Sequence, residues 1–456
     1  MTNKENAPPL STVKDEDKEA AFQQRCRQKR AGWVYTSDIN TLLLYQNNNK
    51  IKEIDLKHKI SRGEKVKVLF LMTNICQFST KTIYKKMLEG DLFDPYILAI
   101  TSNDLLFSKD DSSYHGCMNL CNILEDRGYR VIRGYDNNKK LIPIEQHQPD
   151  ILFYTSPFLD HTDSVSSNLY LNYKFLTCYV AYGMNTINNF GYHYNNKNIN
   201  TAWKYFCDTK RDYEMLLGYS IDFGLNCVLS GAPKLDDYRK DLKDCVIPEK
   251  INNGKKTVIY APHWAIRYDG LAAVNLSTFH LYYKYFLSLL KKYPDINFVF
   301  KPHPRLYSRT TIETNTLTTE EYNNYINDWD SQPNGLYVYD GEYIDLFRAS
   351  SCLITDSGSF IGEYLPSENP CIYLVNPERD PNTYLDGFSS LGNKILDTYH
   401  LAYSQDQIQD YFEKIIIEGI DTTKQQRLKI LEQEYVNIGT ASEKIIEYLT
   451  DILTNK

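Results

Sequence analysis

The stretch CLITDSGSFIGEYL at residues 352–365 decides the fold. Its first residues are apolar or β-branched, as in a buried strand; a turn of small polar residues follows, and residues 360–365 have helical spacing. A strand followed directly by a turn and a helix is the repeating unit of a parallel sheet covered by helices. The stretch therefore predicts an α/β domain with a functional loop at a strand end.

Strand-like runs alternate with helical patterns on both sides of this stretch. In the first half, strands are expected at 66–72, 96–100, 150–154, 178–181 and 202–207, with helices at 80–89 and 115–127. In the second half, strands are expected at 257–261, 297–301, 336–339, 352–355 and 371–375, with helices at 278–292, 344–349 and 360–365. Such alternation indicates parallel sheets with helices on both faces. The predicted fold is two doubly wound, Rossmann-like α/β domains that face a cleft.

The chain divides into four predicted parts. Its 456 residues exceed what one hydrophobic core usually organises. Charged residues, Pro248 and an Asn-Asn-Gly turn interrupt the apolar pattern between residues 236 and 256, where we expect a linker. The parts are a charged arm at 1–35, an N-terminal α/β domain at 36–240, a C-terminal α/β domain at 241–420 and a helical segment at 421–456.

Composition indicates a folded cytoplasmic protein. Apolar residues make up 42% and charged residues 24% of the chain, and the net charge of -7 argues against nucleic-acid binding. Its ten cysteines are scattered, and neither a secretory signal nor a membrane span is apparent. The excess of Asn, Ile, Lys and Tyr fits an AT-rich bacterial genome. Basic residues at 25–30 leave peripheral contact with the inner face of the membrane open, although a solvated arm is the simpler interpretation.

Small polar residues gather in the turn of the opening stretch. Glycine permits close approach of the backbone, and amides and hydroxyls at the start of a helix can bind an anion. An ordinary helix cap accounts for one such residue, but less easily for three hydroxyls together. We expect an anion-binding loop made of Thr355, Asp356, Ser357, Gly358 and Ser359.

Two more predicted strand ends carry cationic or imidazole side chains. The first loop, KPHPR, is stiffened by two prolines and presents Lys301, His303 and Arg305. The second, APHW, provides His263, with Arg267 shortly after it. The alternatives are a surface loop with solvated charges and a packed, hydrogen-bonded His263. Because ligands bind at the carboxyl ends of parallel strands, we favour a shared phosphate site.

Two other kinds of site are not supported. His115, Cys117 and Cys121 lie within one helical stretch, but no second pair completes a zinc site, which favours buried cysteines. The turn after the first strand reads TNIC and lacks the glycines of a dinucleotide-binding fingerprint. We expect neither a metal centre nor an NAD-dependent enzyme.

Four motifs follow one another in a specific order. They are GAPKLD at 231–236, YAPHW at 260–264, KPHP at 301–304, and DLF at 345–347 followed by TDSGS at 355–359. In this order they resemble the bacterial CDP-glycerol glycerophosphotransferase family, which makes teichoic-acid-like and capsular polyol-phosphate polymers. The resemblance covers mainly residues 228–380. It implies a GT-B fold in which the C-terminal domain holds a CDP-activated donor and the N-terminal domain receives the acceptor.

The resemblance also implies how the residues divide the work. His303 and the hydroxyls of Thr355, Ser357 and Ser359 would hold the donor diphosphate. An acceptor hydroxyl would attack the β-phosphate and displace CMP, helped by cations that neutralise the developing charge. No cofactor and no metal is expected beyond the CDP-activated donor, and the acceptor would be a polysaccharide or a lipid-linked chain.

The motifs do not identify the base that takes the acceptor's proton. In the family a WHGTP segment supplies a histidine for this step, whereas the matching segment here reads AYGMN, with Tyr182 in the histidine's place. A tyrosine with a pKa of about 10 is a poor base at neutral pH. The candidates are Tyr182, His161 beside Asp160, and His193 among tyrosines and amides, and a structural role would explain each of them as well.

Three functions follow from these patterns. The first is transfer of glycerol or ribitol phosphate from a CDP-linked donor to a growing capsular or teichoic-acid-like polysaccharide, with release of CMP. The second is a GT-B glycosyltransferase that uses a nucleotide sugar in surface polysaccharide synthesis. This alternative stays open because Tyr182 replaces the family's histidine. The third is a non-catalytic carbohydrate-binding or scaffold subunit. We expect the first, an enzyme of bacterial cell-envelope synthesis.

Overall fold

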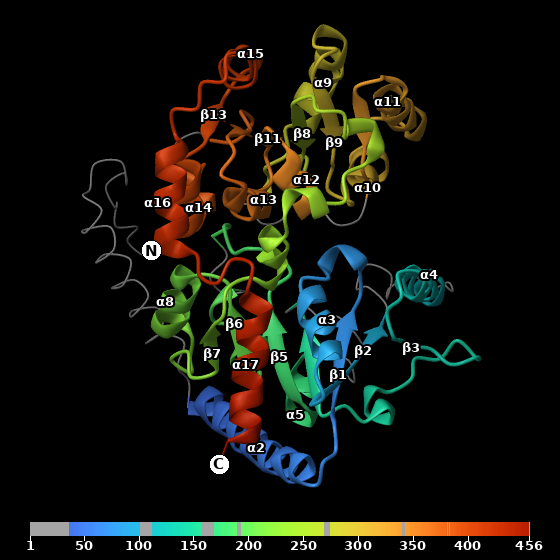
Figure 1. The fold of residues 1–456 in the computed structure, drawn as a ribbon, viewed down its shortest axis with the longest axis vertical. Helices are drawn as coiled ribbons and strands as arrows, with labels where there is room; N and C mark the ends of the chain where they lie inside the picture. Colours follow the sequence, from blue (N-terminus) through green and yellow to red (C-terminus); the bar gives the residue numbers. More distant parts are fainter. Residues whose placement is uncertain are drawn as a thin grey trace, which may run out of the picture.

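The computed structural model describes residues 36–100, 112–156, 168–188, 193–268, 274–339, 343–380, 382 and 384–455. The charged arm at 1–35 and the candidate base His161 lie outside these residues. Within them, two sheets lie one above the other, with helices around each (Figure 1). The structure confirms two doubly wound α/β sheets.

Seven parallel strands form the first sheet, in the order β3-β2-β1-β4-β5-β6-β7. They are β1 (Val66–Met72), β2 (Phe93–Ala99), β3 (Val131–Arg133), β4 (Ile151–Tyr154), β5 (Leu176–Val180), β6 (Lys204–Cys207) and β7 (Cys227–Leu229). The order reverses between β1 and β4. This reversal leaves a crevice beyond the carboxyl ends of the central strands.

Six parallel strands form the second sheet, in the order β10-β9-β8-β11-β12-β13. They are β8 (Thr257–Ala261), β9 (Asn297–Phe300), β10 (Gly335–Tyr337), β11 (Cys352–Thr355), β12 (Cys371–Leu374) and β13 (His400–Ala402). Here the order reverses between β8 and β11, so the two sheets share one winding pattern. Both have the strand order of a Rossmann-like domain.

Helices cover both sheets (Figure 1). Those at or beside the first sheet are α2 (Thr36–Ser61), α3 (Lys81–Glu89), α4 (Ser112–Asp126), α5 (Asn168–Lys174), α7 (Lys197–Asn200) and α8 (Lys210–Tyr219). α17 (Ala441–Thr454) also lies at the first sheet. The others are α9 (Phe279–Lys292), α10 (Leu306–Ser308), α11 (Thr319–Ser331), α12 (Ile344–Ala349), α13 (Gly358–Tyr364), α14 (Ser390–Leu396), α15 (Gln405–Phe412) and α16 (Lys424–Glu434). A short 3₁₀ segment, η5 (Pro233–Arg239), leads out of the first sheet.

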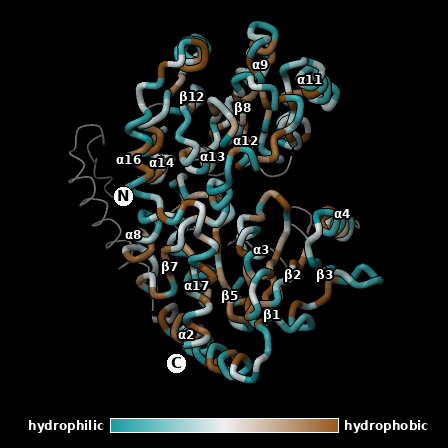
Figure 2. The backbone as a smooth tube through the Cα atoms, in the orientation of Figure 1, coloured by the Kyte–Doolittle hydropathy of each residue, from teal (hydrophilic) through white to brown (hydrophobic). Residues whose placement is uncertain are grey.

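Apolar side chains fill both faces of each sheet. Hydrophobic residues follow the strands of the first sheet (Figure 2), and they form one cluster on each face. One cluster of the second sheet also takes in Met184 and Leu235 from the first half of the chain. The two domains are therefore joined by packed apolar contacts as well as by the chain itself.

The last two helices connect the domains a second time. α16 contacts α14 of the second domain and α8 of the first. α17 then returns to the first domain (Figure 1), where Ile445, Leu449 and Leu453 join its core. The segment predicted as one C-terminal helical part thus consists of two helices with different neighbours.

Candidate active site

Three adjacent strands of the second sheet bring the predicted donor loops together. His303, His263 and Asp356 follow the carboxyl ends of β9, β8 and β11, which are neighbours. The ring centroids of His263 and His303 lie 5.7 Å apart. The N–H of His303 donates to the carbonyl of Pro262 over 3.1 Å. The three loops therefore lie side by side, where the strand order reverses and ligands bind in such sheets.

Thr355 and Asp356 support these loops from within the protein. Both side chains are fully buried. The Thr355 hydroxyl donates to the carbonyl of Ala261 over 2.6 Å. Asp356 accepts the backbone N–H of His263 and both the N–H and the hydroxyl of Thr278. Burial raises the pKa of Asp356 to about 6, and these hydrogen bonds limit the rise. These contacts give both residues a bracing role, behind the surface that a donor would meet.

Ser357, Gly358 and Ser359 lie where α13 begins and meet the first domain there. A Cβ atom on Gly358 would lie 2.5 Å from Cδ1 of Ile187, so glycine makes room for a side chain of the first domain. The hydroxyl of Thr186 donates to the carbonyl of Gly358 over 2.7 Å. The structure thus shows a domain contact at Gly358, where the sequence predicted close approach to an anion.

The predicted cations differ in their surroundings. Lys301 is only 3% exposed and donates to a backbone carbonyl over 3.2 Å. The guanidinium of Arg305 lies over the ring of Trp264, 4.2 Å from its centroid. Arg267 forms an ion pair with Glu378 at 2.8 Å. Lys301 and Arg305 lie beside the histidines, and Arg305 also forms an ion pair with Glu313 at 3.5 Å. The charge of Arg267 is compensated by Glu378.

Hydrogen bonds give both histidines a defined tautomer. The N–H of Ala265 donates to Nδ1 of His263 over 3.3 Å, and the N–H of Arg305 donates to Nδ1 of His303 over 3.0 Å. Burial lowers the pKa of His263 to about 3. The surrounding protein lowers the pKa of His303 well below its ordinary value although the ring keeps contact with solvent, and His263, Lys301 and Arg305 lower it further. Each neutral ring then carries its proton on Nε2, from which it can donate to a ligand oxygen.

The low pKa of His263 predicts a pH dependence of stability. The unfolded chain takes up a proton on this residue near pH 6.5, but the folded protein does so only at about pH 3. Between these values the unfolded state binds more protons, so the free energy of unfolding falls as the pH decreases. We expect the wild type to lose roughly 1 to 2 kcal/mol more than His263→Asn between pH 7 and pH 5. Urea unfolding at both pH values measures this, and equal losses would contradict a neutral, half-buried His263.

The loop after β5 carries Tyr182 to the second domain. The N–H of Ser389 in that domain donates to the carbonyl of Thr186 over 2.7 Å and holds the loop in place. Gly183 packs against the start of α13, since a Cβ atom there would lie 3.5 Å from Cβ of Ser359. The loop that carries Tyr182 therefore contacts the predicted anion-binding loop across the domain junction.

Tyr182 and His193 are the candidate bases within the described residues. Tyr182 is 38% exposed and lines a pocket at the domain junction. The surrounding protein, and then the carboxylate of Glu363, raise its pKa, which makes it a weaker acid and keeps the base form scarce. Burial lowers the pKa of His193 to about 4, and its ring packs edge-on against Tyr194. His193 does not line the pocket that contains Tyr182.

Lys234 and Glu363 line this pocket as well, and neither was predicted as a site residue from the sequence. The ammonium of Lys234 lies 3.4 Å from Oε1 of Glu363 and donates to the carbonyl of Tyr182 over 2.9 Å. Glu363 is 1% exposed and also accepts the hydroxyl of Tyr343. Lys234 belongs to the GAPKLD motif, which is the sequence signal that could have identified it.

Asp208 is the third charged residue of this pocket. It follows β6, two residues beyond the pairing of Val180 with Phe206, so it lies beside Tyr182. It is 6% exposed, and its Oδ1 has no hydrogen-bond partner in the part of the chain that the structure describes. Burial raises its pKa well above the ordinary value, and the carboxylates of Asp212 and Glu363 add to this. A buried carboxylate with a raised pKa in a pocket is suited to accept a proton.

The cysteines of the candidate zinc stretch are core residues. Cys117 and Cys121 are buried on α4, and the thiol of Cys117 contacts the carbonyl of Ala99 over 3.3 Å. Among the described residues, no group of three or more His, Cys, Asp or Glu side chains is placed to hold a metal ion. In the same part of the chain, no helix has both the length and the apolar character needed to cross a membrane.

The two doubly wound sheets and the loops that face each other between them define the architecture of this protein, which is of the GT-B type. The chain belongs to the CDP-Glycerol:Poly(glycerophosphate) glycerophosphotransferase family, which matches residues 177–449. This match confirms the family suggested by the four motifs and identifies the chain as a transferase of that type.

Solved structures share the fold at low sequence identity. A variant of the wall teichoic acid polymerase TagF superposes with a TM-score of 0.55 and 14% identity, covering 95% of this chain and 98% of that one. A putative UDP-N-acetylglucosamine 2-epimerase from Listeria monocytogenes gives 0.53 and 13%, covering 86% and 97%. MnaA from S. aureus, in complex with UDP, gives 0.51 and 14%, covering 85% and 97%. Comparison with curated proteins gives no match.

Proposed function

We propose that this protein transfers a polyol phosphate, glycerol or ribitol phosphate, from a CDP-linked donor to the hydroxyl of a growing teichoic-acid-like or capsular chain. The acceptor oxygen attacks the β-phosphorus, the bond to the α-phosphate oxygen breaks, and CMP leaves. The family supports the teichoic-acid type of reaction. The observation that carries the proposal is the convergence of His263 and His303, 5.7 Å apart between ring centroids, at the reversal of the second sheet.

The donor diphosphate is proposed to lie against these histidines. The Nε2–H group of each ring can donate a hydrogen bond to a phosphate oxygen, because Nδ1 already accepts one from a backbone amide. Lys301 and Arg305 supply positive charge that offsets the charge building up on the departing CMP. Ser357 and Ser359 complete this site, while Thr355, Asp356 and Gly358 hold its shape.

The acceptor hydroxyl is proposed to enter from the first domain, next to Tyr182. Asp208 then serves as the base that takes its proton, because its Oδ1 is unpartnered among the described residues and its raised pKa strengthens it as an acceptor. Lys234 lies between this carboxylate and the second domain, where it can stabilise negative charge on the reacting phosphate. Tyr182 and His193 remain alternative bases, and His161 stays a prediction outside the described residues.

A donor panel tests the reaction. We expect acceptor-dependent release of CMP from CDP-glycerol or CDP-ribitol, with a product heavier by one polyol phosphate per step. Release of a nucleoside diphosphate from a nucleotide sugar would instead establish the glycosyltransferase. This is the second candidate because Tyr182 stands where the family has a histidine. Donor binding without any turnover would indicate a non-catalytic subunit.

Metal independence is tested in the same assay. Since Lys301 and Arg305 are proposed to neutralise the charge on the leaving group, EDTA should leave the rate unchanged. A loss of activity that Mg²⁺ restores would contradict this. An acceptor carried on a lipid would bring the protein to the inner face of the cytoplasmic membrane, and this location stays a prediction.

A further inference from the structure

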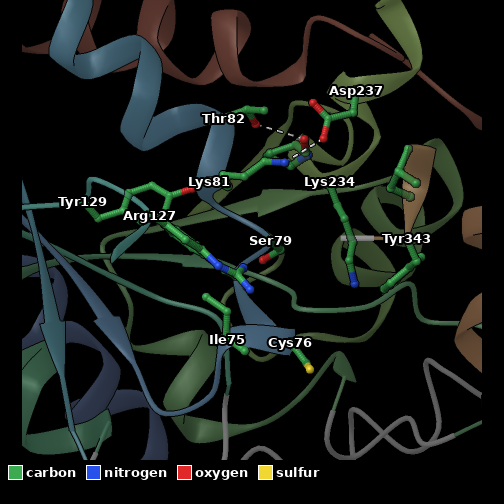
Figure 3. A pocket seen from close by; sticks show the side chains of 13 residues that line it. Ile75, Cys76, Ser79, Lys81, Thr82, Arg127, Tyr129, Lys234, Asp237 and Tyr343 are labelled. Atoms are coloured by element: carbon green, nitrogen blue, oxygen red, sulfur yellow. Dashed lines mark hydrogen bonds and ion pairs between the residues drawn. The ribbon is translucent and has the colours of Figure 1, made fainter. Parts of the chain in front are cut away.

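Two lysines of the candidate active site share one aromatic ring, that of Tyr343. The ammonium group of Lys234 lies 5.0 Å from the centroid of this ring, and Figure 3 shows the two side chains next to each other. The ammonium group of Lys301 lies over the same ring, 5.9 Å from its centroid. Lys234 comes from the segment that leads out of the first domain, and Lys301 directly follows β9 in the second. The ring therefore brings together one cation from each side of the domain junction.

Packing fixes the position of this ring. Tyr343 is buried, and its ring centroid lies 5.0 Å from that of Phe347 and 4.7 Å from that of Phe360. Its hydroxyl donates to Oε2 of Glu363. Burial, and then the Glu363 carboxylate, raise the pKa of Tyr343 well above its ordinary value, so the hydroxyl keeps its proton and stays a donor. A fixed, uncharged ring at this place can orient an ammonium group by cation–π attraction.

The Tyr343 hydroxyl also limits how strongly Glu363 compensates Lys234. It bonds to Oε2 of the carboxylate, while Lys234 lies 3.4 Å from Oε1, which is longer than the roughly 2.8 Å of a strong charge-assisted hydrogen bond. The ring itself carries no net charge. Lys234 is therefore held in place while much of its positive charge stays available to a ligand.

We propose that Tyr343 is a positioning residue for the transfer step, which holds Lys234 and Lys301 at a fixed separation. The inference rests on the proposed function and names the residue that aligns its cations. The negative charge of a phosphoryl group in transit is spread over several oxygen atoms, so one cation meets only part of it. Lys234 then meets the group that moves to the acceptor, while Lys301 meets the departing CMP. A small displacement of either ammonium group weakens the stabilisation of the transition state.

Fluorination of the ring tests this role with little change in ring size. In the full-length protein, Tyr343→Phe is compared with variants that carry mono-, di- and trifluorinated phenylalanine at this position, because fluorine weakens the negative face of the ring. We expect kcat for CMP release to fall with each fluorine, by about tenfold across the series, with KM for the donor unchanged. Tyr293 is the matched control, since its ring has the ammonium group of Lys292 at 5.0 Å but precedes β9, at the opposite edge of the sheet. The same series there should leave kcat unchanged.

A second measurement needs no turnover. The ring current of Tyr343 should shift the ε-methylene protons of Lys234 and Lys301 upfield in the NMR spectrum, and Tyr343→Leu should abolish both shifts. A kcat that does not depend on fluorination, or lysine resonances that Tyr343→Leu leaves in place, would overturn the inference. Upfield shifts that depend on Tyr343, in a protein that releases no CMP from any CDP-linked polyol, would support the placement of the lysines while refuting the proposed reaction.

Discussion

Replacing His303 with alanine should abolish transfer and weaken donor binding. The variant loses the Nε2–H group proposed to contact the donor diphosphate, and the neighbouring Arg305 amide loses its acceptor at Nδ1. A lost hydrogen bond to a charged group corresponds to roughly a tenfold weaker donor affinity, and loss of charge stabilisation lowers kcat by about a hundredfold or more. Calorimetry with CDP and the CMP-release assay measure the two effects.

The matched control for this variant is His58→Ala. His58 is an exposed histidine on α2, far along the chain from the donor loops, and its loss should change neither value. Unchanged CDP affinity and turnover in His303→Ala would refute the donor-site assignment.

The second large effect is expected for Asp208→Asn. If Asp208 takes the acceptor's proton, its amide replacement should lower kcat by about a hundredfold to ten-thousandfold, because it removes the base. Donor affinity should be unchanged, since Asp208 lies in the first domain. Because burial raises the pKa of Asp208, the wild-type rate should fall as the pH decreases through that pKa, and this fall should be absent from the variant.

Two other variants control this experiment. Asp222 is a buried aspartate that bonds to Ser220 and Gly224 and lies outside the pocket that contains Tyr182 and Asp208. Asp222→Asn should therefore leave the rate unchanged. Tyr182→Phe should reduce the rate less than Asp208→Asn does. The reverse ranking, with Tyr182→Phe nearly inactive, would assign the base to Tyr182 instead.

The central strands could be predicted from the sequence, whereas several edge strands could not. β1, β8 and β11 match the predicted residues because they are buried on both faces and consist of apolar or β-branched residues, apart from the half-buried Lys67 in β1. β3, β7 and β13 were missed, since each has three residues, lies at a sheet edge and is only partly buried. Such strands form by pairing with a neighbour, and their own sequence carries little signal.

The donor loops could be placed from the sequence because the carboxyl ends of parallel strands share one edge. The sequence did not show that the Asp356 carboxylate accepts hydrogen bonds from His263 and Thr278, since both partners are far from Asp356 along the chain. Asp208 was missed for a related reason. Its unpartnered oxygen and its place beside Tyr182 depend on the pairing of β5 with β6 and on burial, neither of which a local motif records.

The central claim is that the β-phosphorus of a CDP-linked polyol moves to the acceptor. The most direct measurement uses CDP-glycerol and CDP-ribitol that carry a radioactive β-phosphorus, with a polyol-phosphate acceptor and the full-length protein. The account predicts that the label appears in the extended acceptor while the released nucleotide, CMP, is unlabelled. Label that stays in a nucleoside diphosphate, or an acceptor that remains unlabelled with both donors, would contradict it.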